Sequence, residues 1–352
     1  MGRQDARSFR LGTLIVAATF TLAAMSTLLI RVPAPGPLVG TASAQAKTYK
    51  IRMANVLNPG DPTVDAMTDF KKEVEDKSGG RITVELFSSA QLGSQEEVVE
   101  MIKSGAAQIH IASPQYPAKY LPELQVITLP YLFGSPEAFD RALDGAVGAE
   151  MSRLVEEKTE FKILAFEEFG LKNVFNRRRP VNTLDDLKGL KLRVINASVT
   201  IRTFGALGAS PVGMPINEVY SAIQTGVLDG AEQPLNVIRS GKFYEVAKYV
   251  SLTGHFYEIA LAYANKAFIN GLPGDLRTIV TDAAQNMAKK ERQAARINAK
   301  SAREFLTSRD MVVNDIAPAE LAKMKAAVRP VYDWAKQQWG AELVTRVLQG
   351  TQ

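Results

Sequence analysis

The chain has 352 residues, of which 46% are hydrophobic and 22% charged, so it has the composition of a globular protein long enough for two domains. It contains no cysteine, which excludes disulfides, thiolate metal sites and a lipid-anchoring cysteine, and its two histidines are too few for a histidine-based metal site. We therefore expect no metal and no cofactor.

The net charge of +5 arises mostly at the amino terminus, and this argues against a nucleic-acid partner. Residues 1–46 hold four of the 42 basic residues and one of the 37 acidic residues, so the rest of the chain has 38 basic and 36 acidic residues. A near-neutral chain lacks the basic surface that DNA-binding proteins use. We expect no binding to nucleic acid.

Residues 1–46 have the three parts of a secretory signal peptide. Three arginines precede the apolar segment Leu11–Ile30, and small residues with an A-x-A pattern follow at Thr41–Ala46. We expect cleavage after Ala44 or Ala46, which places the mature protein in the periplasm. The alternative is an uncleaved membrane anchor, because about 20 apolar residues can span a bilayer.

Short strands and helices alternate through the next part of the chain, and this alternation predicts parallel βαβ units of an α/β fold. In such sheets the ligand crevice lies off the carboxyl ends of the strands, which here are Asn55, Ser88 and Ser113. The expected elements are a strand at Tyr49–Ala54, a helix at Val64–Lys77, a strand at Arg81–Phe87, a helix at Gln95–Lys103 with Ser94 as its N-cap, and a strand at Gln108–Ala112.

Two long apolar passages and one long helix are expected to connect the two halves of the fold. The strand Phe161–Phe166 leads to a domain crossover near Gly170, and Tyr249–Asn265 is the return crossover. Helical spacing over Asp275–Thr307 predicts a helix about 45 Å long that could brace both halves. A further amphipathic helical region is expected at Pro318–Trp339.

The strand Lys191–Ile195 carries the main candidate for a ligand-binding residue, Arg193. An arginine flanked by aliphatic residues near the end of a strand is costly to bury unless an anion meets it. Its planar guanidinium matches a carboxylate with two hydrogen bonds, which lysine cannot copy. The alternative is a structural arginine paired with a carboxylate of its own chain. The run Arg177–Arg179 is expected to be a solvated surface run, because three consecutive residues cannot all face one crevice.

The segment after this strand predicts structure and not catalysis. Asn217 is a suitable N-cap and Gly226 a suitable terminating residue for a helix at Glu218–Thr225. Asp229 and Glu232 fit a capping or hinge role, because no nucleophile and base accompany them. The chain has no P-loop, no G-x-S-x-G motif and no dinucleotide fingerprint, so we expect no catalytic residues and no enzyme.

Several ordered motifs resemble the periplasmic solute-binding subunits (DctP type) of TRAP transporters. The resemblance is collinear from about Tyr49 to Trp339. The motifs that carry it are Gln91–Gly93 (QLG), Leu129–Tyr131 (LPY), Leu187–Val194 (LKGLKLRV), Gly208–Pro215 (GASPVGMP), Glu218–Tyr220 (EVY), Gln224–Gly230 (QTGVLDG) and Lys242–Tyr249 (KFYEVAKY).

This resemblance implies a two-lobed periplasmic binding protein with parallel-rich mixed sheets, crossover strands and a long bridging helix. On that basis we expect residues 47–170 with 259–298 to form lobe I, and residues 171–258 with 299–352 to form lobe II. The family also implies delivery of an organic acid to a membrane permease that is driven by an ion gradient. In that family the arginine of this strand binds the ligand carboxylate, and it corresponds to Arg193.

Other family positions transfer with changes, and these changes bear on the ligand. A second arginine near the hinge glycine is replaced by Lys172, which keeps the charge but not the planar fork. The departures from sialic-acid binders at Gln233, Ile216 and Ser113 argue against that ligand and leave a smaller acid, such as a C4-dicarboxylate, or a sugar acid. Asn55 and Asn196 are candidate amide contacts that could equally be turn residues.

Two other classes of protein remain as alternatives at this point: an exported enzyme that acts on a carboxylate, and an exported structural or adaptor domain. The sequence does not indicate the oligomeric state, because nothing in the pattern of exposed residues marks an interface.

Overall fold

The structure, a computed structural model, describes residues 47–351. The expected signal peptide and its cleavage sites lie in residues 1–46, outside the described residues. Within the described part of the chain, no helix has both the length and the apolar character needed to cross a membrane.

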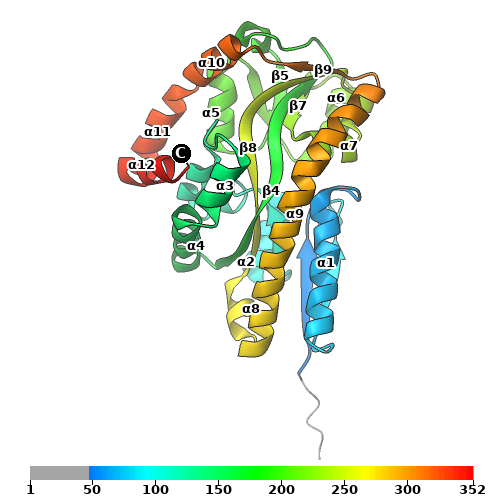
Figure 1. Cartoon of the computed structure of the whole chain (residues 1–352), viewed down its shortest axis with the longest axis vertical. Helices are drawn as coiled ribbons and strands as arrows, with labels where there is room; N and C mark the ends of the chain where they lie inside the picture. Colours follow the sequence, from blue (N-terminus) through cyan, green and yellow to red (C-terminus); the bar gives the residue numbers. More distant parts are fainter. Residues whose placement is uncertain (1–46, 352) are drawn as a thin grey trace, which may run out of the picture. The chain divides into compact units, whose positions relative to one another are not determined.

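A mixed sheet forms the centre of the described residues (Figure 1). The order of its strands is β2-β1-β3-β8-β4-β7-β5-β6, with β9 beside β8. The strands are β1 (Tyr49–Ala54), β2 (Ile82–Phe87), β3 (Ile109–Ala112), β4 (Phe161–Asn176), β5 (Lys191–Val194), β6 (Ser210–Gly213), β7 (Gly230–Gln233), β8 (Tyr249–Asn265) and β9 (Val312–Asp315).

Two parallel groups of strands lie at opposite ends of this order. In one group β1 pairs in parallel with β2 and β3, and in the other β5 pairs in parallel with β6 and β7. The long antiparallel pair β4 and β8 joins the groups, with a register from Phe161↔Asn265 to Asn176↔Tyr249. The predicted parallel units and both crossovers are therefore present, and the fold class is confirmed. The residue bounds of the two lobes stay a prediction.

Gly170 lies at an irregularity of this antiparallel pair, where the register shifts between Glu168 and Gly170. Its φ of 105° is in the region that favours glycine, because a Cβ would collide with the backbone in that conformation. A shift of this kind bends and twists a strand. The local geometry therefore agrees with the crossover predicted near this glycine.

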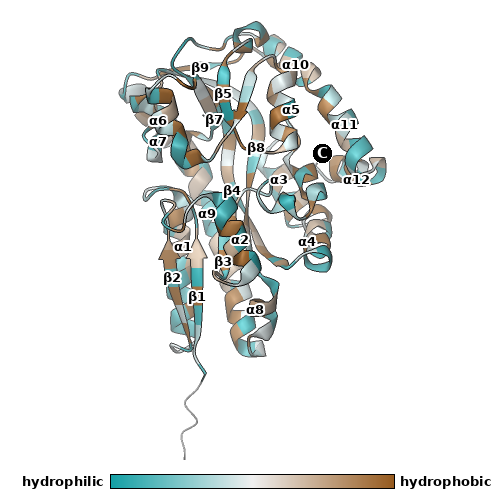
Figure 2. Ribbon diagram, turned by 180° about the vertical axis from the view of Figure 1, so that it is seen from behind, coloured by the Kyte–Doolittle hydropathy of each residue, from teal (hydrophilic) through white to brown (hydrophobic). Residues whose placement is uncertain are grey.

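Helices cover the sheet, and hydrophilic and hydrophobic residues alternate along them (Figure 2). The helices are α1 (Pro62–Lys77), α2 (Gln95–Ser104), α3 (Pro136–Leu143), α4 (Ala146–Lys158), α5 (Ser198–Ala206), α6 (Val219–Gln224), α7 (Leu235–Ser240), α8 (Lys266–Gly271), α9 (Gly274–Ser308), α10 (Pro318–Ala327), α11 (Arg329–Trp339) and α12 (Ala341–Gly350). Short 3-10 helices lie at Pro117–Lys119, Pro122–Thr128, Leu184–Leu187, Ile216–Glu218 and Phe243–Glu245.

The predicted helix ends are partly confirmed. Ser94 begins α2 with a capping box, in which its hydroxyl accepts from the Glu97 backbone and the Glu97 carboxylate accepts from the Ser94 backbone. The N-cap predicted at Asn217 is wrong, because a 3-10 turn at Ile216–Glu218 precedes α6 and the turn contains this residue. The helical region Pro318–Trp339 is divided into α10 and α11, since Pro330 lies in the first turn of α11.

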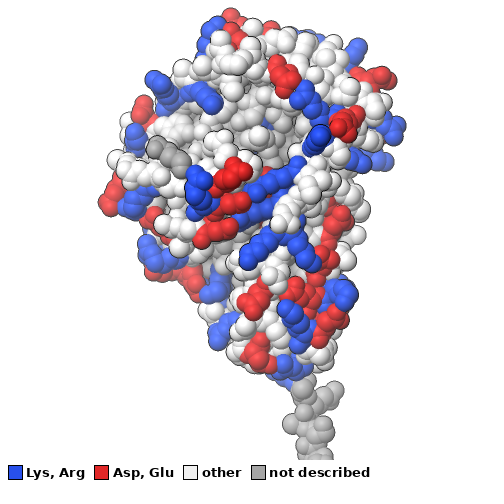
Figure 3. All heavy atoms as spheres, viewed as in Figure 1, with Lys and Arg blue, Asp and Glu red and all other residues white. Residues whose placement is uncertain are grey.

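The long helix α9 packs against α1, β4 and α7, so it contacts elements that follow both parallel groups of strands. Its buried stripe includes Leu276, Val280, Ala284 and Met287. Basic and acidic side chains are interspersed on the face shown in Figure 3, without a field of one sign.

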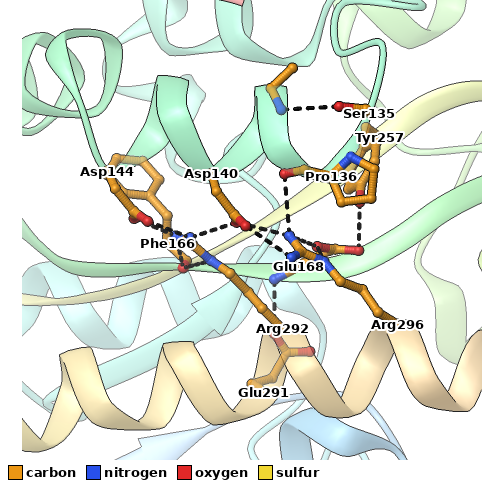
Figure 4. Close-up of polar contacts among 11 residues, drawn as sticks. Ser135, Pro136, Asp140, Asp144, Phe166, Glu168, Tyr257, Glu291, Arg292 and Arg296 are labelled. Carbon is orange, nitrogen blue, oxygen red and sulfur yellow. Dashed lines mark hydrogen bonds and ion pairs between the residues drawn. The ribbon is translucent and has the colours of Figure 1, made fainter.

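Two arginines of α9 fasten it to β4 and α3 (Figure 4). Arg292 donates to the backbone oxygen of Phe166 at 3.0 and 2.7 Å and to the Asp144 carboxylate at 2.9 Å through two nitrogens. Arg296 donates to the Asp140 carboxylate at 2.8 and 2.9 Å and to Glu168 Oε2 at 2.8 Å. These bonds fix the helix against the first crossover strand.

We expect Arg292→Met to lower the free energy of unfolding by about 2 kcal/mol, because it leaves a buried carbonyl unpaired and a carboxylate without its partner. Lys290→Met is the matched control on the same helix, since the Lys290–Asp69 pair is exposed and should contribute little. Urea unfolding of both variants measures the difference. Equal losses in the two would contradict a special role for Arg292.

Candidate ligand-binding site

A small cavity of about 30 Å³ lies where the carboxyl ends of β3, β5 and β7 meet the two crossover strands. Its polar lining consists of Gln95, Ser113, Tyr116, Lys172, Arg193, Gln233 and Glu258. Its apolar lining consists of Val56, Leu57, Phe169, Ile195, Ile216 and Val237. Five of the predicted site residues therefore line one cavity: Ser113, Lys172, Arg193, Ile216 and Gln233.

Arg193 is 1% exposed, and its guanidinium forms no direct ion pair with the described residues. Its Nε donates to the backbone oxygen of Met214 at 2.7 Å, whereas Nη2 has no hydrogen-bond partner among the described residues. No carboxylate oxygen of residues 47–351 lies within ion-pair distance of the guanidinium. The structural alternative, an internal ion pair, is therefore not seen here.

Lys172 is also 1% exposed, but its charge is compensated within the protein. Its Nζ lies 3.1 Å from Glu232 Oε2, 3.2 Å from Glu232 Oε1 and 3.2 Å from Glu258 Oε2. Burial by itself lowers the pKa of Lys172, but the two carboxylates outweigh it and the pKa is raised. Lys172 is therefore a buried cation that is already paired with two carboxylates.

Glu232 lies behind Lys172 and is fully buried. Burial raises its pKa, but Lys172 and His255 outweigh that effect and the pKa of Glu232 is lowered. His255 Nε2 lies 3.5 Å from Glu232 Oε2, and burial lowers the pKa of His255, so the imidazole is neutral. Glu232 thus takes part in a buried ion pair beneath the cavity and not in a helix cap.

Glu258 belongs to β8 and completes the charged part of the cavity wall. Burial raises the pKa of this carboxyl, and the Lys172 ammonium partly opposes the rise. Sequence reasoning did not single it out. The available signal was a lone acidic residue directly before the apolar run Ile259–Ala264.

Tyr116, Gln95 and Phe169 also line the cavity without having been predicted. Tyr116 lies beside Arg193: burial raises the pKa of its phenol, and the guanidinium opposes this. Tyr116 follows β3 by a few residues, in the polar loop expected after Ser113.

The two predicted asparagines lie outside the lining of this cavity. Asn55 Nδ2 donates to the Ile111 backbone oxygen at 2.8 Å, and its Oδ1 accepts from the Leu57 backbone at 2.5 Å, so it is a turn residue that positions Leu57. Asn196 lines a neighbouring cavity, which shares Tyr116 with the first. No group of three or more His, Cys, Asp or Glu side chains in residues 47–351 is arranged to hold a metal ion.

Comparison with known proteins relates this architecture to a family of receptors. Residues 53–338 match bacterial extracellular solute-binding protein family 7 (DctP). The 2,3-diketo-L-gulonate-binding periplasmic protein of Escherichia coli K12 is 33% identical, and the match covers 73% of this chain and 78% of that protein. The C4-dicarboxylate-binding periplasmic protein of Rhodobacter capsulatus is 30% identical, with 90% of this chain and 97% of that protein covered.

A solved structure with the same fold is that of the sugar acid binding protein DctPAm from Advenella mimigardefordensis in complex with galactonate. Its TM-score is 0.84 at 31% sequence identity, and the match covers 87% of this chain and 98% of that chain. The similarity extends across both parallel groups of strands and the crossovers between them.

Proposed function

We propose that Arg193 anchors the ligand of this protein and that a membrane permease then receives that ligand. The basis is that the chain belongs to extracellular solute-binding protein family 7 and is thus an organic-acid receptor of the TRAP type. The ligand would be a small organic acid, either a C4-dicarboxylate or similar carboxylate or, as the alternative, a sugar acid. The permease, driven by an ion gradient, is proposed from the family alone.

The observation that supports the anchor is the buried guanidinium of Arg193, whose Nη2 has no hydrogen-bond partner among the described residues. A buried cation is costly when no anion accompanies it, and a carboxylate returns both a charge and two aligned acceptors. The cavity beside it is small and is bordered by neutral hydrogen-bonding groups such as Gln233 and Ser113. An organic acid fits this combination better than an amine or a neutral sugar does.

The names of the similar proteins are consistent with this class of ligand. They refer to a C4-dicarboxylate, to a diketogulonate and to galactonate, which share a carboxylate group. An exported enzyme is the weaker alternative, since the family consists of solute-binding proteins. We propose that binding closes the two predicted lobes by bending near Gly170 and in the return strand β8.

Calorimetry with a panel of acids tests this proposal. We expect one acid to bind for each protein molecule, while neutral counterparts such as galactitol do not bind. Ligand at about 100 times its dissociation constant should stabilise the protein by roughly 2.7 kcal/mol and raise its melting temperature by several degrees. NMR of the bound acid should show no product. Turnover of the acid, or no response to any acid, would contradict the proposal.

A further inference from the structure

The charged groups around the cavity accept one ligand carboxylate and offer no place for a second. Arg193 and Lys172 are the basic residues of the described lining. The Lys172 ammonium already forms ion pairs with two carboxylates of the protein, Glu232 at 3.1 Å and Glu258 at 3.2 Å, so its charge is offset before a ligand binds. Only the Arg193 guanidinium remains to neutralise a bound anion.

Glu258 adds an acidic oxygen to the same wall, so a second ligand carboxylate would meet a like charge in a site shielded from water. We propose that Glu258, held by Lys172, makes the cavity selective for acids that carry a single carboxylate and a hydroxylated tail, and selects against dicarboxylates. This inference rests on the proposed function, because it takes Arg193 as the carboxylate anchor.

The rest of the polar lining fits a hydroxylated tail. The Gln233 side chain makes no hydrogen bond or ion pair with the described residues, so both its donor and its acceptor can serve a ligand. Ser113 pairs with Glu258, and a hydroxyl in the ligand can join this pair as a donor to the carboxylate. A carboxylate at the same place has no proton to donate. Hydroxyl groups are therefore accepted where a second acid group is rejected.

The test compares two matched pairs of probes, D-erythronate with meso-tartrate and D-galactonate with galactarate. Each pair differs only in the terminal group, which is CH₂OH in the monoacid and a carboxylate in the diacid. In calorimetry we expect the wild-type protein to bind a monoacid at least tenfold more tightly than its diacid. Glu258→Gln should reduce this ratio about tenfold, mainly through tighter binding of the diacid.

Two further variants keep the result interpretable. Glu258→Asp keeps the charge and should keep the preference for monoacids, whatever it does to stability. Glu96→Gln makes the same change in charge at an exposed residue of the neighbouring cavity and should leave the ratio unchanged. A diacid preferred by the wild type, or a ratio in Glu258→Gln equal to that of the wild type, would overturn the inference.

The outcomes also separate this inference from the proposed function. If dicarboxylates bind and lose affinity when Arg193 is replaced, the receptor function stands and the selectivity for monoacids falls. If no acid binds at all, the proposed function itself fails, and the inference fails with it.

Discussion

Replacement of Arg193 by alanine is expected to weaken binding of an organic acid by about a hundredfold to a thousandfold. A charge-assisted hydrogen-bonded pair contributes about 1.5–3 kcal/mol, and a ligand carboxylate left unpaired in a buried site adds a further penalty. Since about 1.4 kcal/mol corresponds to a tenfold change in affinity, a loss of about 3–4 kcal/mol gives this range. Calorimetry with the acid that the wild type binds measures it.

Arg193→Lys separates the charge from the geometry of the guanidinium. It keeps the cation but not the planar fork, so we expect a smaller loss than with alanine. Arg178→Ala is the matched control, because Arg178 is exposed and lies 3.6 Å from Asp229, away from the cavity lining. Unchanged affinity of Arg193→Ala would remove this residue from the site.

The stability of the unliganded protein gives a second readout. If Arg193 were structural, its removal would unfold or strongly destabilise the protein, because a buried carboxylate would be left without its ion-pair partner. In the described residues no carboxylate lies within ion-pair distance of it, and the Met214 carbonyl and the Tyr116 phenol each lose a hydrogen-bond partner. We therefore expect the unliganded alanine variant to melt within a few degrees of the wild type.

Much of the fold was predictable because its signals are local. The alternation of polar and apolar residues gave the bounds of β1 as observed, and a long apolar passage gave those of β8. The period of the long helix placed α9 within one residue at each end. The glycine near the first crossover marked the irregularity of β4. These features depend on neighbours in the chain, which a single sequence contains.

Helix ends were less predictable where two local structures compete. Asn217 has the residue type of an N-cap, but the backbone forms a 3-10 turn there, which satisfies the same groups differently. Pro330 lies inside a continuous amphipathic pattern, yet a new helix begins at Arg329, with Pro330 in its first turn. Pattern alone does not decide between a bend and a break.

The binding site was predictable only in part, for a physical reason. Arg193 could be found from its own strand, because its cost of burial is evident beside Leu192 and Val194. The role of Glu258 depends on Lys172, and the antiparallel pairing of β4 and β8 brings these distant residues together. The sequence therefore indicated that the Lys172 ammonium is available to a ligand, whereas the structure pairs it with Glu232 and Glu258.

A second group of buried charges lies between the first crossover strand and α9. Glu167 and Glu291 are 0% and 1% exposed, and both oxygens of Glu167 and Oε1 of Glu291 lack hydrogen-bond partners in the described residues. Asp61 is buried at the start of α1, where it accepts from the Thr63 backbone and from Asn236. Burial raises the pKa of Glu167 to about 8 and that of Asp61 to about 6, and it raises the pKa of Glu291 well above its ordinary value.

These shifts predict that acidic conditions stabilise this part of the protein. Arg292 opposes the shift of Glu167, and Asp61 adds to it. A carboxyl with a raised pKa keeps its proton in the folded state at a pH where the unfolded chain has lost it. The folded state then binds more protons, so the free energy of unfolding falls as pH rises from about 4.5 to about 8, and it levels off above that.

Glu167→Gln removes the part of this pH dependence that comes from Glu167, because the glutamine side chain is neutral at every pH. Its amide can also donate a hydrogen bond to Glu291. We expect its free energy of unfolding to match the wild type near pH 4.5 and to exceed it by about 3–5 kcal/mol near pH 8.5, since one pKa unit corresponds to about 1.4 kcal/mol. Urea unfolding at several pH values measures the difference between the two proteins, which reports Glu167 together with its effect on the pKa of Glu291. Glu160→Gln, an exposed residue that precedes β4, should follow the wild type throughout. If the two proteins differ in free energy of unfolding by the same amount at every pH, Glu167 has an ordinary pKa in the folded state. The buried carboxyls would then need hydrogen-bond partners that keep them ionised.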